Sequence, residues 1–184
     1  PQVISNGFSY LASRDIVDIA MPHLNDLRNT VSMSCHLTIR EGCDAVYIYR
    51  SFASQRLSVN VPPGTRIPCH CSAVGRVLLT GLTETELEQL YQHVRLDGYA
   101  RDAPRTLPEL KQTIAADYQQ GWVEHRSDYA TAIATALRDH HNHVVAAINV
   151  SGPDAVMMDD RQKESVREAL LSTAQRISFE LGNL

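Results

Sequence analysis

The chain has 184 residues, enough for one ordinary domain with a substantial buried core. Hydrophobic residues make up 43% of the sequence and charged residues 21%, proportions typical of a folded globular protein. The net charge of −4, without any basic run, argues against nucleic-acid binding by this chain itself. Since there is neither a bilayer-spanning apolar stretch nor a visible signal peptide, we expect a cytoplasmic protein without membrane contact.

We expect residues 1–30 to form linker helices and residues 31–184 to form one domain. The chain starts at Pro1 rather than at a methionine, so we expect a fragment of a longer protein. Ser13 is a suitable N-cap for a helix with an apolar face, and Pro22 is expected to kink or split that helix. These helices would connect the domain to a missing upstream one.

Alternation of polar and apolar residues predicts two groups of antiparallel strands. On this pattern Tyr47 and Tyr49 share one face of their strand. Val144 lies on the face of Ala146, and Val145 on the opposite face. The strands are expected at residues 33–39, 45–51, 57–61, 122–124, 130–137 and 143–151.

Helical spacing and capping residues predict four helices in the domain. The second has a capping-box pattern in Thr83 and Glu86, and Gly121 ends the third. The helices are expected to begin at Ser72 (or Cys71 before it), Thr83, Pro108 and Asp159–Asp160.

The stretch 64–79 predicts a turn, a short extended entry through Cys71, and then a helix. Ser72, Ala73 and Gly75 make the first helical turn small, which leaves its backbone N–H groups approachable by a carboxylate or phosphate. Alternatively, the same small residues let the helix pack closely on a sheet. The sequence leaves both interpretations open.

A second candidate site lies on the late strands. Alternate alanines in 130–136 share one face, and Asn149 and Ser151 lie two residues apart on the next strand. Small side chains beside two polar ones leave space for a ligand, or for a closely packed helix.

Cysteine and histidine residues offer no metal or catalytic pattern. The four cysteines are expected to be reduced thiols. Cys69, His70 and Cys71 are adjacent on a segment expected to be extended, so they point in opposite directions, and no CxxC or HxxxH spacing supplies further zinc ligands. The histidines at 140, 141 and 143 fit a polar turn. We therefore assign no metal, cofactor or catalytic residue.

The order of several motifs resembles the C-terminal effector-binding domain of the IclR-type bacterial transcriptional regulators, over essentially the whole chain. The motifs are Pro68-Cys69-His70-Cys71-Ser72-Ala73-Val74-Gly75-Arg76-Val77-Leu78-Leu79, Pro104-Arg105-Thr106-Leu107, Gln120-Gly121-Trp122, Val145-Ala146-Ala147-Ile148-Asn149-Val150-Ser151-Gly152-Pro153 and Ile177-Ser178-Phe179-Glu180-Leu181-Gly182.

This resemblance implies an α/β (α+β) fold: a GAF-like antiparallel sheet flanked by helices. It also implies an upstream winged helix-turn-helix that reads DNA, a homodimer or homotetramer, and a small organic acid as effector. The effector-binding residues that it implies, with the neighbouring positions we add to them, are Ile67, Cys71, Ser72, Ala73, Val74, His125, Asp128, Ala132, Asn149 and Ser151.

The chain departs from the family pattern at the site. Segment 124–129 is shorter and lacks a glycine, while Ala132 and Asn149 replace a cysteine and a serine. These changes disfavour a very small keto acid, and a carboxylate with a larger apolar or aromatic body is the alternative. The competing function is a small cytosolic enzyme that uses the same pocket, with Cys71 or His125 as its reactive group.

The charge pattern makes a first prediction. Residues 1–184 alone should show no salt-dependent affinity for duplex DNA, because they offer no basic surface to neutralise phosphates. Fluorescence anisotropy with a labelled duplex at several salt concentrations measures this. Tight, salt-sensitive binding would contradict the assignment as a sensor domain.

Overall fold

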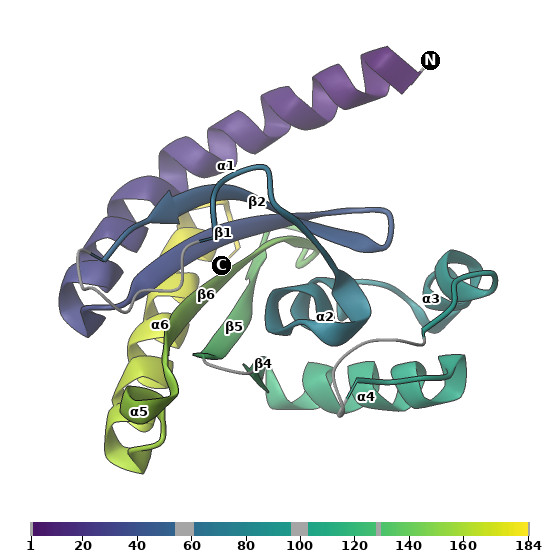
Figure 1. Cartoon of the computed structure of the whole chain (residues 1–184). Coiled ribbons are helices and arrows are strands. Elements are labelled where there is room, and N and C mark those ends of the chain that lie inside the picture. Colours follow the sequence, from purple (N-terminus) through teal and green to yellow (C-terminus); the bar gives the residue numbers. More distant parts are fainter. Residues whose placement is uncertain (1, 54–60, 97–102, 128–129, 184) are drawn as a thin grey trace.

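The computed structural model describes residues 2–53, 61–96, 103–127 and 130–183, with side chains from residue 15 onward. Six strands form one antiparallel sheet in the order β3-β2-β1-β6-β5-β4 (Figure 1). Two meanders thus lie side by side, joined where β1 pairs with β6. The strands are β1 (Ser34–Glu41), β2 (Asp44–Ser51), β3 (Arg66–Pro68), β4 (Trp122–Arg126), β5 (Ala130–Arg138) and β6 (Val144–Pro153).

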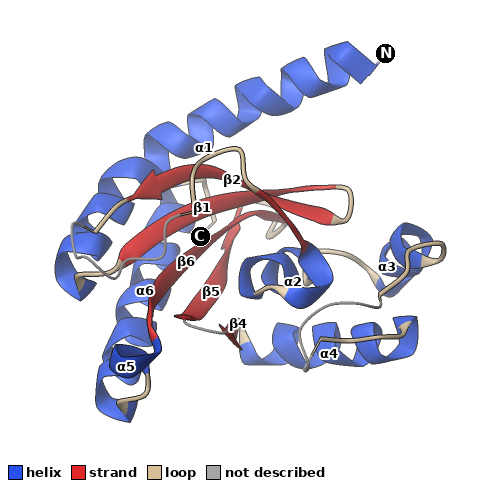
Figure 2. Ribbon diagram, viewed as in Figure 1, coloured by secondary structure: helices blue, strands red, loops and turns tan. Residues whose placement is uncertain are grey.

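Helices cover both faces of this sheet (Figure 2). Helices α1 (Gln2–Val31) and α6 (Asp160–Glu180) pack on one face, with the short α5 (Asp154–Met157) beside α6. Helix α2 (Ala73–Leu79) packs on the other face, and α4 (Leu107–Gln120) and α3 (Glu84–Tyr91) lie outside it. The expected α/β fold with a helix-flanked antiparallel sheet is confirmed.

Each face of the sheet has its own apolar core. Leu37, Ile133 and Ile148 point toward α1 and α6 and meet Leu24 and Leu170 there. On the opposite face, a second core packs around α2; its members include Ala45, Cys69, Val74, Leu79, Ala134 and Ala147. Successive residues of β5 therefore point alternately into the two cores.

Caps confirm the predicted helix boundaries in the domain, except that α4 begins at Leu107, after the N-cap Thr106, rather than at Pro108. The Ser72 side chain accepts a hydrogen bond from the Gly75 N–H, and Thr83 and Glu86 form a complete capping box. Gly121 ends α4 in the left-handed conformation at φ 78°. Asp159 caps α6.

The prediction for residues 1–30 was wrong in detail. They form a single helix, α1, that begins at Gln2, so Ser13 lies inside the helix and not at its start. Pro22 also lies inside α1 and does not split it. Packing of the later turns against α6 and the sheet supports the helix past the proline. Leu57 and Val59, from the strand expected at 57–61, lie outside the described residues.

Two shifts in strand register correct the predicted faces. The pairing shifts between Leu37 and Thr38, so that Tyr49 packs on the α1–α6 side rather than sharing a face with Tyr47. A second shift, between Leu137 and Arg138, exchanges the faces of Val144 and Val145. One extra residue in a strand reverses the alternation beyond it, and the sequence does not mark its position.

Helix α2 approaches the preceding segment very closely. Residues 69–71 form a 3₁₀ turn, η1, and not the extended chain predicted. A Cβ atom added at Gly75 would lie 2.2 Å from the Cα of Cys69, so only glycine fits there. Gly75 therefore allows close packing, but against the 3₁₀ turn η1 and not against the sheet as expected.

Gly75 generates a prediction about stability. Gly75→Ala should lower the free energy of unfolding by about 1–3 kcal/mol, because backbone atoms must move to admit the methyl group. Urea denaturation measures the change. The control Ser165→Ala, at an exposed position of α6, should change it by less than about 0.5 kcal/mol. Equal stability of Gly75→Ala and the parent chain would contradict the packing described here.

Candidate functional site

A cavity of about 360 Å³ lies where the beginning of α2 meets the α2-facing side of the sheet. Side chains of β2, β3, β4, β5 and β6 reach it, together with the turn that precedes α2. Its lining consists of Tyr47, Val61, Thr65, Ile67, Pro68, Cys71, Ser72, Ala73, Val74, His125, Ser127, Ala130, Ala132, Asn149 and Ser151.

Every predicted site residue within the described ranges lines this cavity. Asp128 lies outside the described residues. Sequence reasoning missed Tyr47, Ser127 and Ala130, among others. Strand alternation was a usable signal for Tyr47, because it places the ring on the α2-facing side. Val61 belonged to a strand expected from alternation, but nothing in that pattern marked it as part of a site. Thr65 comes from the turn before β3, which gave no periodic signal.

The polar part of the cavity is made by β6. Asn149 and Ser151 are only 1% and 6% exposed, and the Asn149 Nδ2 donates a hydrogen bond of 2.7 Å to the Ser151 Oγ. The Ser151 hydroxyl hydrogen remains able to donate to another group. The Asn149 Oδ1 has no hydrogen-bond partner in the part of the chain that the structure describes. This pair can therefore offer a ligand both donors and an acceptor.

The beginning of α2 forms the opposite wall. The Ser72 Oγ donates to the Pro68 carbonyl at 3.0 Å and accepts from the Gly75 N–H at 3.2 Å, which fixes the helix start over β3. The amides of Ala73 and Val74 lie in the first turn, where helix geometry provides no intrahelical acceptor. Both residues line the cavity, so their amides border the same space as Asn149.

The thiols near the cavity are poor nucleophiles. Burial raises the pKa of the Cys71 thiol above its ordinary value and that of Cys69 to about 12. The reactive form of cysteine is the thiolate, which such surroundings disfavour at neutral pH. Nowhere in the described residues do three histidine, cysteine or acidic side chains gather closely enough to hold a metal ion.

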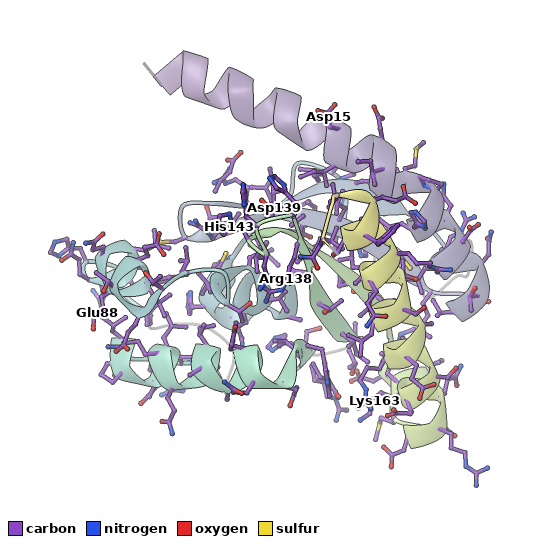
Figure 3. All side chains as sticks on the ribbon, turned by 180° about the vertical axis from the view of Figure 1, so that it is seen from behind. Asp15, Glu88, Arg138, Asp139, His143 and Lys163 are labelled. Atoms are coloured by element: carbon purple, nitrogen blue, oxygen red, sulfur yellow. The ribbon has the colours of Figure 1, made fainter. Side chains whose placement is uncertain are left out.

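The histidines of the β5–β6 turn lie elsewhere, and none of them lines the cavity. Asp139 Oδ1 accepts the backbone N–H groups of His141 and His143, each at 2.9 Å. Figure 3 shows Asp139 and His143 together at this hairpin tip. The segment is an exposed polar turn, as predicted.

One buried histidine beside the cavity was not predicted as part of the site. His36 of β1 is fully buried and stands edge-on to the Tyr47 ring, with 5.3 Å between ring centroids. Burial, aided by the positive charge of Arg50, lowers the pKa of His36 to about 4. The imidazole is therefore neutral at physiological pH. Its alternation with Cys35 and Leu37 was the available signal.

Fold and cavity together define an α/β domain with a helix-flanked antiparallel sheet, in which a concave, mostly apolar space carries a few convergent polar groups. Pockets that bind small molecules commonly have this form. Comparison with known proteins identifies the family. Residues 8–179 match the family described as the C-terminal domain of the bacterial transcriptional regulator IclR. The chain belongs to this family.

Individual relatives support the assignment. The chain is 31% identical over 186 residues to the HTH-type transcriptional repressor AllR of Salmonella paratyphi A. This alignment covers 98% of this chain and 67% of AllR. It resembles the crystal structure of the Agobacterium tumefaciens repressor BlcR with a TM-score of 0.79 at 25% identity, covering all of this chain and 74% of BlcR. The IclR of Thermotoga maritima shares the fold, with a TM-score of 0.83 at 23% identity over 98% of this chain and 74% of that one. The described helices include none with the length and apolar character needed to cross a membrane.

His36 generates a prediction about pH. Because its pKa is about 4 when folded and ordinarily 6.5, the unfolded chain binds more protons between these values, and stability should fall as the pH decreases through this window. His36→Phe should lose less stability over the same window. Urea denaturation across the pH range measures this, with His93→Gln at an exposed position as the control. An identical pH dependence in His36→Phe and the parent would contradict the prediction.

Proposed function

We propose that this chain is the effector-binding domain of a bacterial transcriptional regulator, and that the cavity beneath α2 binds a small organic acid. The observation that carries the proposal is the convergence of predicted effector-binding residues on one cavity. They come from β3, the start of α2, and strands β4, β5 and β6, which are far apart in the sequence.

The lining supports an acid with an apolar body. The Ser151 hydroxyl, the Asn149 amide and the first-turn amides of α2 supply neutral hydrogen-bond donors for a carboxylate. Most of the remaining lining is apolar, with Ile67 and Val74 as examples. Because the cavity has room beyond a carboxylate, an acid with an aliphatic or aromatic body fits it better than a very small keto acid.

Regulation requires that the effector favours one of two arrangements of the protein. In the proposed mechanism the domain forms a homodimer or homotetramer in the cytoplasm, and an upstream winged helix-turn-helix binds DNA. Effector binding would shift the oligomer between arrangements and so change the spacing of the DNA-binding domains. Helix α1 supports this role: its later turns pack on the sheet and α6, while its beginning projects beyond them (Figure 1).

The alternative, a small enzyme that uses Cys71 or His125, is less well supported. The raised pKa of Cys71 disfavours a thiolate nucleophile. The relative AllR is a transcriptional repressor and the similar BlcR is a repressor. A thermal-shift screen of organic acids, followed by product analysis of each stabilising compound, separates the two functions. Stabilisation without turnover supports the sensor. Turnover that is lost in both Cys69→Ser and Cys71→Ser would establish the enzyme.

Two substitutions in the cavity test where the acid binds. Ser151→Ala should weaken binding of the most stabilising acid about five- to a hundredfold, because it removes a buried donor. Ala132→Leu should block the cavity by filling it. Both variants should fold, as judged by circular dichroism, and calorimetric titration measures their affinities.

Matched controls make this test specific. Ser178→Ala changes a buried serine on the other side of the sheet, and Ala136→Leu enlarges an alanine of β5 that does not line the cavity. Both controls should bind the acid as the parent does. Parent-like affinity in Ser151→Ala and Ala132→Leu would show that the acid binds elsewhere.

A further inference from the structure

A row of polar side chains is buried on the α2-facing side of β1 and β6. Ser34, His36 and Thr38 follow at alternate positions of β1 and are each 0% exposed. Ser34 is the strand partner of Ser151, and His36 is the strand partner of Asn149. Five polar side chains therefore occupy adjacent positions on β1 and β6, in the middle of the α2-facing side of the sheet.

Several polar atoms in this row lack partners. Within the described ranges, no hydrogen bond is made by either ring nitrogen of His36, by the Thr38 Oγ1 or by the Asn149 Oδ1. Burying such atoms without a partner destabilises the folded state, and native proteins rarely contain several of them together. A group that binds in the cavity and supplies the missing hydrogen bonds would explain them.

The position of His36 suits contact with such a group. On β6, its strand partner Asn149 lines the cavity; on β2, the Tyr47 ring lines the cavity and stands edge-on to the imidazole at 85°. His36 thus lies next to two lining residues without lining the cavity itself. A bound molecule would reach the imidazole only after the Tyr47 side chain moves.

We propose that His36 is a specificity-determining residue of this cavity, which together with the Asn149 Oδ1 binds a hydroxyl group on the carbon next to the effector's carboxylate. This inference rests on the proposed function. The hydroxyl would accept the N–H of the imidazole and donate to the Asn149 Oδ1. The carboxylate would accept from the Ser151 hydroxyl.

Hydrogen-bond complementarity selects a hydroxyl over a keto oxygen. A neutral imidazole carries one N–H donor, whereas the Asn149 Oδ1 only accepts. A hydroxyl group satisfies both, but a keto oxygen satisfies the imidazole alone and leaves the amide oxygen without a donor. The charged group that faces His36 is Arg50, its strand partner on β2, and it opposes protonation of the ring. Tyr47 supplies an uncharged phenol, since burial raises the pKa of Tyr47 to about 12.

The test compares acids that differ only at this carbon. Mandelate and phenylacetate form one pair, and lactate and propionate form a pair with a smaller body. Calorimetric titration of the parent chain should show about tenfold tighter binding of the hydroxy acid in at least one pair. Phenylglyoxylate, the keto analogue of mandelate, should bind more weakly than mandelate.

Variants of β1 assign the preference to His36. His36→Phe should abolish the preference: binding of the hydroxy acid should weaken about tenfold, and binding of the acid without the hydroxyl group should change little. His36→Gln, which keeps a donor, should retain part of it. Thr38→Val is the matched control: it removes another unpartnered polar atom of β1, but its strand partner on β6 is Ala147 and not Asn149. This variant should keep the full preference.

The outcomes separate this inference from the proposed function. Equal affinities within both pairs, a preference for the keto analogue, or a preference that survives in His36→Phe would each overturn the role of His36. An ordered water on His36 that persists in a crystal structure with bound mandelate would also overturn it. If neither pair binds while other acids stabilise the domain, this inference fails and the proposed function stands. If no acid binds, both fail.

Discussion

The close contact between Gly75 and the Cys69 backbone determines where the cavity lies. It brings the start of α2 onto the 3₁₀ turn after β3, and the two hydrogen bonds of Ser72 hold the helix in that position. Ala73 and Val74, the first residues of α2, consequently line the cavity opposite the strands. A larger residue at position 75 would move this wall, so one glycine couples the stability of the fold to the shape of the site.

Strands β5 and β6 form the wall of the cavity opposite α2. The small alanine side chains of β5 leave space above the sheet, and Asn149 and Ser151 of β6 place polar atoms beside that space. A core built only for stability would fill this space with larger apolar side chains. Under the proposed function, the unpartnered polar atoms of β1 and β6 represent stability given up for ligand binding, a pattern common in binding sites.

The sequence predicted much of this arrangement, because its strongest signals are local. The alternation in 130–137, the capping box at Thr83 and the glycine at 121 each depend on a few neighbouring residues, and the structure confirms them. The register shifts that reverse Tyr49 and Val144 were missed, because they arise from pairing between strands. His36 was missed as part of the site for a similar reason. Its importance comes from partners on β2 and β6, and strand order is not readable from spacing alone.

We propose that an acid binds between the start of α2 and strands β5 and β6. Nuclear magnetic resonance of the domain with labelled alanine methyl groups, titrated with mandelate, tests this binding site most directly. We expect saturable shifts of the methyl signals of Ala73, Ala130 and Ala132, which line the cavity, while the signals of Ala146 and Ala174 in the other core do not shift. Shifts confined to Ala146 and Ala174, or a titration in which mandelate binds without moving the cavity alanines, would contradict it.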